Sequence, residues 1–147
     1  MFYHDRSCDQ SEKIISLPVN NTQLNVSKTN TSYQVGGWVE CLALNYLLKH
    51  GLKRLAQNYR CRIGEIDLIM QEDKYLVFVE VRYRKNEDFG GAKASITRNK
   101  QQKIRQVAQY YLKKFGMRAQ HIFCRCDVIA VSGAKEGLKI EWLKNAF

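Results

Sequence analysis

The chain of 147 residues is within the usual size of one domain and is long enough to bury a hydrophobic core without disulfides. Hydrophobic residues make up 45% of it and charged residues 26%, which excludes wholesale disorder and the fibrous classes. The net charge of +10 favours a polyanionic partner, either nucleic acid or an anionic membrane surface, although solubility alone could also explain it.

The five cysteines show no paired Cys-x-x-Cys spacing, so we expect neither a disulfide framework nor a zinc site. The first residues, MFYHDRSCDQ, carry acids and lack the apolar segment of a secretory signal. No apolar run reaches the roughly 18 residues that a membrane-spanning helix needs. The sequence therefore predicts a cytoplasmic protein with reduced thiols and no membrane partner.

Residues 1–35 are predicted to be a flexible polar tail, and residues 36–147 to be the folded domain. The stretch VNNTQLNVSKTNTS has too few apolar residues to offset the entropy lost on ordering it. Three bases balance three acids in the tail, so the net charge of +10 belongs to residues 36–147. The folded part is therefore the expected polycation.

A first helix is predicted from Gly37 to Gly51, with Gly51 as its C-terminal cap. Its apolar residues recur at spacings of three and four, the period of an amphipathic helix: Val39, Leu42, Ala43, Tyr46 and Leu47. Residues 53–60, 65–70 and 75–84 then read as three strands, and the polar QEDK forms a tight turn between the last two.

A second helix follows a glycine-containing loop at 86–95, and Gly116 ends it. Its apolar positions keep the helical period: Ile104, Val107, Ala108, Tyr111, Leu112 and Phe115. Residues 121–131 read as a fourth strand, and residues 138–147 as a fifth strand or a docked tail. The predicted element order is α-β-β-β-α-β, with a possible final strand.

Four charged residues stand in the otherwise apolar second and third strands: Glu65, Asp67, Glu80 and Arg82. Strict alternation along the second strand places Ile66, Leu68 and Met70 on one face and Glu65, Asp67 and Ile69 on the other. Burying the uniformly apolar faces together sets the register parity of the two strands. Asp67 and Glu80 are therefore expected to share a face of the sheet.

Two neighbouring carboxylates repel each other, and a hard divalent cation with oxygen ligands is a natural counter-ion for them. Arg82 lies on the same face as Glu80 and can clamp a phosphate, but an arginine stays protonated and cannot serve as a general base. The alternative is a set of cross-strand ion pairs on a solvated sheet face. Spacing alone does not choose between the two interpretations.

Several segments resemble the bacterial YraN family, endonuclease-like proteins of the PD-(D/E)xK superfamily: GWVECLALNYLLKHG, NYRCRIGEIDLIM, LVFVEVRYR, RCDVIAV and the closing NAF. The resemblance covers about residues 36–147, and GEIDLI followed by VFVEV is quite specific. It implies an α/β, restriction-endonuclease-like αβββαβ core, with a mixed central sheet flanked by helices. This is the element order that periodicity indicates.

By position, the resemblance implies that Asp67 is the first metal-binding aspartate and Glu80 the acidic residue of the (D/E)xK element. It also implies that Glu40 on the first helix completes a site for Mg²⁺ or Mn²⁺, with Glu65 as an outer member. Arg82 stands where the family usually has a lysine that is thought to orient or activate the attacking water. A guanidinium cannot perform that proton transfer.

Basic residues near the predicted site are candidates for contacts with backbone phosphates: Arg60, Arg62, Lys93, Lys100 and Lys103. Arg60 and Arg62 flank the start of the second strand, and Lys100 and Lys103 lie on the second helix. An ordinary solvated helix shows the same lysine-rich face. The global charge favours nucleic acid as the partner, with DNA expected ahead of RNA.

The sequence thus predicts a Mg²⁺- or Mn²⁺-dependent nuclease, with Glu40, Asp67 and Glu80 holding the ion and Arg82 stabilising charge on the phosphate. The alternative is a nucleic-acid-binding module of the same fold that has lost cleavage. A purely structural interaction protein is a third possibility, but it leaves the charge and the resemblance unexplained. The sequence does not predict the oligomeric state.

Overall fold

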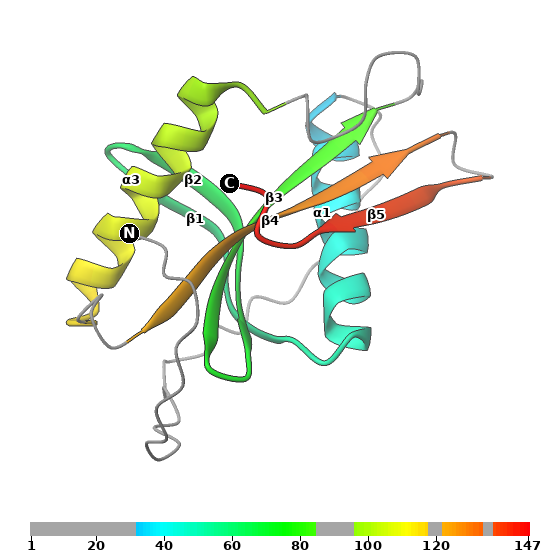
Figure 1. Ribbon diagram of the computed structural model, residues 1–147. Coiled ribbons are helices and arrows are strands. Elements are labelled where there is room, and N and C mark those ends of the chain that lie inside the picture. Colours follow the sequence, from blue (N-terminus) through cyan, green and yellow to red (C-terminus); the bar gives the residue numbers. More distant parts are fainter. Residues whose placement is uncertain (1–31, 85–95, 118–121, 134–136) are drawn as a thin grey trace.

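The computed structural model describes residues 32–84, 96–117, 122–133 and 137–147 (Figure 1). Within these ranges the elements are α1 (Ser32–Lys49), β1 (Lys53–Cys61), β2 (Gly64–Glu72), β3 (Tyr75–Arg84), α3 (Arg98–Lys114), β4 (Phe123–Ser132) and β5 (Lys139–Leu143). No helix in the described ranges is long and apolar enough to cross a bilayer.

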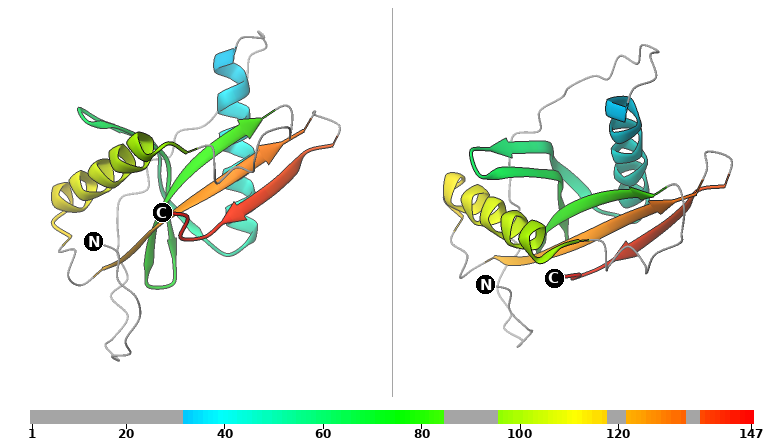
Figure 2. Two further views of the ribbon diagram at one scale, coloured as in Figure 1. Left: turned by 45° about the horizontal axis from the view of Figure 1, so that its top comes forward. Right: turned by 90° about the horizontal axis from the view of Figure 1, so that it is seen from above.

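The strands form one five-stranded sheet in the order β1-β2-β3-β4-β5. Neighbouring strands are antiparallel except for β3 and β4, which are parallel. A parallel pair needs a long crossover connection, and α3 lies between these two strands in the sequence. Helices α1 and α3 cover opposite faces of the sheet (Figure 2). The predicted α/β, restriction-endonuclease-like core with a mixed sheet is confirmed.

Helix α1 begins at Ser32, earlier than the predicted start at Gly37. It ends as predicted at Gly51, whose φ of 89° is in the left-handed region that glycine adopts without a steric penalty. The amide of Gly51 donates to the carbonyl of Leu48 (3.1 Å), and that of Leu52 donates to the carbonyl of Leu47 (3.2 Å). These bonds close the last turn. Residues 1–31 of the predicted tail lie outside the described residues.

Helix α3 starts at a side-chain cap, because the hydroxyl of Thr97 accepts a hydrogen bond from the amide of Lys100 at 3.3 Å. Its buried residues are five of the six predicted from periodicity: Ile104, Val107, Ala108, Tyr111 and Leu112. Phe115 is 40% exposed at the C-terminal end, where Gly116 follows. The cap and the buried stripe fix the rotation of the helix, so Lys100 in its first turns faces the sheet.

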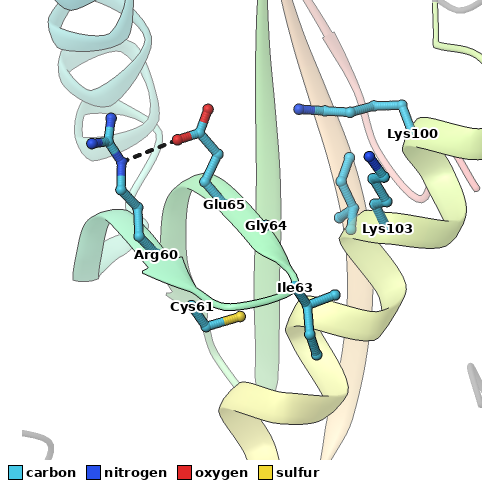
Figure 3. A pocket seen from close by; sticks show the side chains of 8 residues that line it. Arg60, Cys61, Ile63, Gly64, Glu65, Lys100 and Lys103 are labelled. Atoms are coloured by element: carbon cyan, nitrogen blue, oxygen red, sulfur yellow. Dashed lines mark hydrogen bonds and ion pairs between the residues drawn. The ribbon is translucent and has the colours of Figure 1, made fainter.

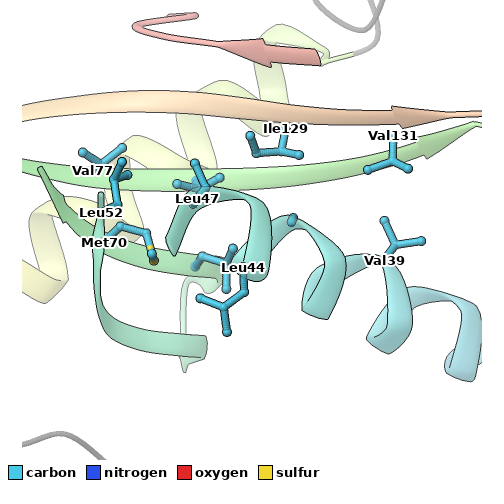
Figure 4. Close-up of a cluster of buried hydrophobic side chains, with 11 residues drawn as sticks. Val39, Leu44, Leu47, Leu52, Met70, Val77, Ile129 and Val131 are labelled. Atoms are coloured by element: carbon cyan, nitrogen blue, oxygen red, sulfur yellow. The ribbon is translucent and has the colours of Figure 1, made fainter. Parts of the chain in front are cut away.

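Each face of the sheet has its own hydrophobic core. The core under α1 contains Val39, Ala43, Leu44, Leu47, Leu52, Leu68, Met70, Val77, Val79, Ile129 and Val131 (Figure 4). The core under α3 contains Ile66, Ile69, Leu76, Phe78, Ile104, Val107, Ala108, Tyr111, Leu112 and Cys126. All of these side chains are less than 9% exposed, so both helices are held by close packing.

Strands β2 and β3 separate part of the way along their length. They are paired from Leu68↔Val79 to Glu72↔Tyr75. The part of β2 before Leu68 pairs with β1 and no longer with β3. The part of β3 from Glu80 onward pairs with β4 (Figure 2). We call this separation the fork. The prediction that Ile66 shares a face with Leu68 was wrong: Ile66 packs in the α3 core, because β2 turns away with β1 at the fork.

The C-terminal segment forms both predicted alternatives, a strand and then a docked end. β5 pairs with β4, and beyond it the amide of Ala146 donates to the carbonyl of Cys126 at 2.8 Å. The fully buried Asp127 accepts hydrogen bonds from the indole of Trp142 and the amide of Asn145, both at 2.9 Å. One buried carboxylate therefore holds this segment onto the sheet.

Candidate functional site

The fork brings the predicted carboxylates together. Asp67 is the first β2 residue beyond the paired part of the β2–β3 ladder, and Glu80 is the corresponding residue of β3. The carboxylate of Asp67 accepts a hydrogen bond from the backbone amide of Val81 at 2.8 Å. This side chain thus takes the place of the ladder carbonyl that β2 no longer supplies. The bond fixes Asp67 in the gap between the strands.

The surroundings of Asp67 disfavour its ionised form. Burial, followed by the negative charge of Glu80, raises the pKa of Asp67 to about 7. The carboxylate of Glu40 on α1 also raises this pKa, while the Val81 amide and the ammonium of Lys100 lower it. The charges of Glu80 and Glu40, two of the three carboxylates that the sequence predicted to act together, thus both act on the third, Asp67, although the three come from different elements.

Glu80 is 3% exposed and carries two ion pairs on one oxygen. Its Oε1 lies 3.1 Å from Nζ of Lys100 and 3.2 Å from Nη2 of Arg82. Its Oε2 is buried and accepts no hydrogen bond from the described residues. Burial raises the pKa of Glu80, although Lys100 and Arg82 act in the opposite direction. Oε1 is thus paired with two cations, whereas Oε2 has no hydrogen-bond partner among the described residues.

Arg82 also has an unused donor. Its Nη2 pairs with Glu80, but its Nε is buried and makes no hydrogen bond within the described part of the chain. The side chain is 36% exposed, so part of the guanidinium reaches the surface beside the fork. A guanidinium so placed can donate to an oxygen of a phosphate that approaches the carboxylates.

The fork provides carboxylate oxygens that could bind a divalent cation, but fewer converging ligands than such an ion often has in proteins. The partly buried Asp67 and the buried Glu80, both with raised pKa values, and the unpartnered Oε2 of Glu80 are a donor set suited to Mg²⁺ or Mn²⁺. No three His, Cys, Asp or Glu side chains converge on one point among the described residues. Asp67 and Glu80 are therefore the two ligands that fit best, and the inclusion of Glu40 stays a prediction.

Lys100 contacts a strand residue that the sequence did not predict it to contact. It was predicted only as a phosphate contact on a solvated helix, yet its amine pairs with the buried Glu80. Arg82 occupies the strand position where a lysine was expected, and Lys100 reaches the same carboxylate from α3. The Thr97 cap and the lysine were visible as sequence signals, but neither indicates which strand residue the first turns of the helix contact.

The other predicted basic residues divide into three groups. Arg60 pairs with Glu65 at 3.1 Å, and both side chains are more than half exposed. Arg62 is exposed in the turn between β1 and β2, and Lys103 is exposed on α3. Lys93 lies outside the described residues. The alternative of cross-strand ion pairs therefore holds for Arg60 and Glu65, although the charge of Glu65 also raises the pKa of Glu80.

A pocket lies beside the fork, between the β1–β2 turn and α3 (Figure 3). Its volume is about 390 Å³, and its lining consists of Arg60, Cys61, Ile63, Gly64, Glu65, Lys100, Lys103 and Ile104. Three of the residues predicted to contact nucleic acid, Arg60, Lys100 and Lys103, thus line one hollow. Lys100 belongs both to this pocket and to the ion pair with Glu80.

Comparison with known proteins agrees with the sequence motifs. The model of "Uncharacterised protein family UPF0102" matches residues 39–131, a range that contains all the fork residues. A UPF0102 protein of Legionella pneumophila is 55% identical over 113 residues, which is 76% of this chain and 92% of that protein. A UPF0102 protein of Saccharophagus degradans is 48% identical over 114 residues, which is 78% of this chain and 92% of that protein. A UPF0102 protein of Nitrosococcus oceani is 45% identical over 120 residues, which is 82% of this chain and 96% of that protein.

Proposed function

The chain belongs to the UPF0102 family, the YraN family that its motifs resemble, and on this premise we propose that it is a metal-dependent nuclease. It would hydrolyse phosphodiester bonds of nucleic acid, DNA ahead of RNA, with Mg²⁺ or Mn²⁺ as the cofactor. The observation that carries the proposal is the pair of carboxylates at the fork, the partly buried Asp67 and the buried Glu80, with Oε2 of Glu80 unpartnered among the described residues.

The chemistry follows from the positions of the side chains. A divalent ion bound by Asp67 and Glu80 would polarise the phosphate and lower the pKa of a bound water. The exposed part of the Arg82 guanidinium can donate to a phosphate oxygen, where charge increases in the transition state. The fixed hydrogen bond from Val81 to Asp67 orients that carboxylate before substrate binds.

Lys100 provides an amine next to Glu80, whereas the strand position where the family usually has a lysine is occupied by Arg82. An amine can donate a hydrogen bond to a water or a phosphate oxygen and can also exchange a proton, whereas a guanidinium stays protonated. The ion pair holds its Nζ 3.1 Å from Glu80, within reach of any water or phosphate next to that carboxylate. We propose that Lys100 positions the attacking water, the task that the resemblance assigns to a lysine on the strand.

The charge of the chain supports nucleic acid as the substrate. The net charge is +10, and the pocket beside the fork carries Arg60, Lys100 and Lys103. Four described cysteines are free, which fits the reducing cytoplasm as the proposed setting.

The proposal is tested by incubating the purified protein with duplex, flapped, branched and single-stranded DNA and RNA, in Mg²⁺, Mn²⁺ or chelator. Cleavage is expected with metal only, and Asp67→Asn and Glu80→Gln should each abolish it. Glu141→Gln is the matched control, because Glu141 is an exposed carboxylate on β5 and lies outside the site. Calorimetry with Mn²⁺ should give a binding heat for the wild type that Asp67→Asn and Glu80→Gln lose.

The second candidate function is a nucleic-acid-binding module that does not cleave. Its supporting observation is that Lys100 and Arg82 already neutralise Oε1 of Glu80, so the chain's own cations compete with a metal. Metal-independent DNA binding by the wild type, without cleavage in any metal, would favour this function over the nuclease.

A further inference from the structure

We propose that the pocket between the β1–β2 turn and α3 is a subsite that holds one unpaired nucleotide of the substrate strand beside the carboxylates of the fork. The inference rests on the proposed nuclease function and extends it by naming the form of substrate. Three observations support it: the size of the pocket, its lining of basic and apolar side chains, and the contact of its lining residue Lys100 with Glu80.

The size of the pocket exceeds what a phosphate alone requires. Its volume of about 390 Å³ lies within the range of roughly 300–1,000 Å³ that small-molecule sites occupy. The close approach of the turn to α3 forms one wall: a Cβ placed on Gly64 would lie 3.4 Å from the side chain of Val107. The hollow therefore suits a unit with a sugar and a base attached to the phosphate.

The lining combines positive charge with apolar surface. Lys100 and Lys103 lie on α3, while the half-buried Ile63 on the turn supplies aliphatic surface and the buried Ile104 lies at the base of the pocket. Glu65 is the acidic group in the lining, and Arg60 pairs with it at 3.1 Å (Figure 3). A ligand with an anion at one end and a flat, weakly polar ring at the other matches this lining. A nucleotide has that composition.

The pocket is continuous with the fork through Lys100. The lysine lines the pocket and also lies 3.1 Å from Oε1 of Glu80. A nucleotide whose phosphate contacts Lys100 and Lys103 therefore places the neighbouring phosphate of its strand near Asp67 and Glu80.

The lining selects an unpaired nucleotide, because a base within a duplex is stacked and paired and cannot contact Ile63 in the pocket. Enzymes that bind a single base take it out of the stack and pack it against apolar side chains, and the cost is lowest where the base is already unpaired. Base-edge hydrogen bonds are not needed, so we expect a preference for substrate form and not for sequence.

The test measures binding in chelator by fluorescence anisotropy, with a blunt DNA duplex and the same duplex carrying one unpaired terminal nucleotide. The wild type should bind the second DNA on the order of tenfold more tightly. Lys103→Glu and Ile63→Ala should each reduce this ratio towards one. Lys113→Glu is the matched control, with the same charge change on α3 at an exposed position outside the pocket lining. It should weaken both complexes equally and keep the ratio.

A competition experiment separates a nucleotide site from a phosphate site. Thymidine monophosphate should abolish the preference at a concentration at which inorganic phosphate does not. Equal effects of the two competitors would show that the aliphatic lining is not used, and would overturn the inference. Ile63→Ala keeps every charge, so it tests the same point if Lys103→Glu fails to fold.

The inference is also overturned if the wild type binds both duplexes equally or neither, or if Lys103→Glu and Lys113→Glu change both affinities alike. These outcomes differ from failure of the proposed function. Metal-dependent cleavage without a binding preference would keep the nuclease and remove the subsite. A preference that Lys103→Glu abolishes, without cleavage in any metal, would keep the subsite and remove the nuclease.

Discussion

The amine of Lys100 lies 3.1 Å from Oε1 of Glu80, although one residue is on helix α3 and the other is on strand β3. Arg82 contacts the same oxygen from the strand at 3.2 Å. Two cations of different chemistry thus share one buried carboxylate. The proposed nuclease depends on this arrangement, because the lysine absent from position 82 is replaced from another element.

Lys100→Arg is predicted to keep metal and DNA binding but to reduce cleavage by about 10²–10⁴-fold, the usual contribution of a positioned catalytic group. The charge next to Glu80 is retained, but a planar guanidinium cannot place the attacking water as the Lys100 amine does. The measurement is the single-turnover cleavage rate in Mn²⁺ over a range of pH. Lys113→Arg, an exposed position on the same helix, is the control. Wild-type rates and an unchanged pH profile in Lys100→Arg would contradict the assigned role.

Arg82→Lys is predicted to cleave no faster than the wild type, because Lys100 already supplies an amine to Glu80. The substitution also replaces the partly exposed guanidinium, which can bind a phosphate through two donors, by a single amine, so phosphate binding should weaken. The same cleavage assay measures the effect, together with the affinity for DNA in chelator. If Arg82→Lys cleaves DNA where the wild type does not, the natural protein is the binding module and not a nuclease.

Asp67→Asn is predicted to flatten the pH dependence of stability. Burial and the charge of Glu80 raise the pKa of Asp67 from 3.8 to about 7 on folding. Between these values the folded protein holds a proton that the unfolded chain has released, so the free energy of unfolding falls as pH rises through that window. Above it, Asn should be more stable than Asp by up to roughly 4 kcal/mol, since each pKa unit corresponds to about 1.4 kcal/mol.

The measurement for Asp67→Asn is urea unfolding in chelator at a series of pH values. The Asn oxygen can still accept the hydrogen bond from the Val81 amide, so the comparison isolates the charge. Asp73→Asn is the control, because Asp73 is exposed in a turn at a φ of 48° that Asn tolerates. An Asp67→Asn protein with the wild-type pH slope would be inconsistent with a buried, ionisable carboxylate at the fork.

Asp127→Ala is predicted to destabilise the protein by about 3–5 kcal/mol, the typical effect of removing one partner of a buried ion pair. The fully buried carboxylate accepts from Arg125 at 3.0 Å and from Trp142 and Asn145 at 2.9 Å, and these donors would lose their acceptor. Urea denaturation monitored by tryptophan fluorescence measures the effect. Glu141→Ala on the exposed side of β5 should change stability by less than about 0.5 kcal/mol.

Gly51→Ala and Gly37→Ala are predicted to have opposite effects. Gly51 has a φ of 89°, which alanine rarely adopts, so its substitution should destabilise by about 1 kcal/mol or more. Gly37 lies within α1, and a Cβ added there would meet no atom of another described element within 4 Å, so alanine should stabilise the helix by up to about 1 kcal/mol. Thermal unfolding of the two variants checks both signs. Stabilisation by Gly51→Ala would contradict the left-handed cap.

The element order and the buried stripe of α3 could be predicted from the sequence alone. These features follow from local backbone geometry, because the periods of 3.6 and 2 set which side chains share a face. The cap at Gly51 and the third strand from Tyr75 to Arg84 were likewise readable from neighbouring residues.

The surroundings of the carboxylates follow from the packing of elements that are distant in the sequence. Strict alternation along a continuous strand could not anticipate the fork, where Ile66 joins the α3 core and the Val81 amide binds Asp67. Nor could it place Lys100 against Glu80, because that contact depends on how α3 packs across the sheet after a long connection. Interactions between residues distant in sequence are set by the packing of whole elements, and no local period records them.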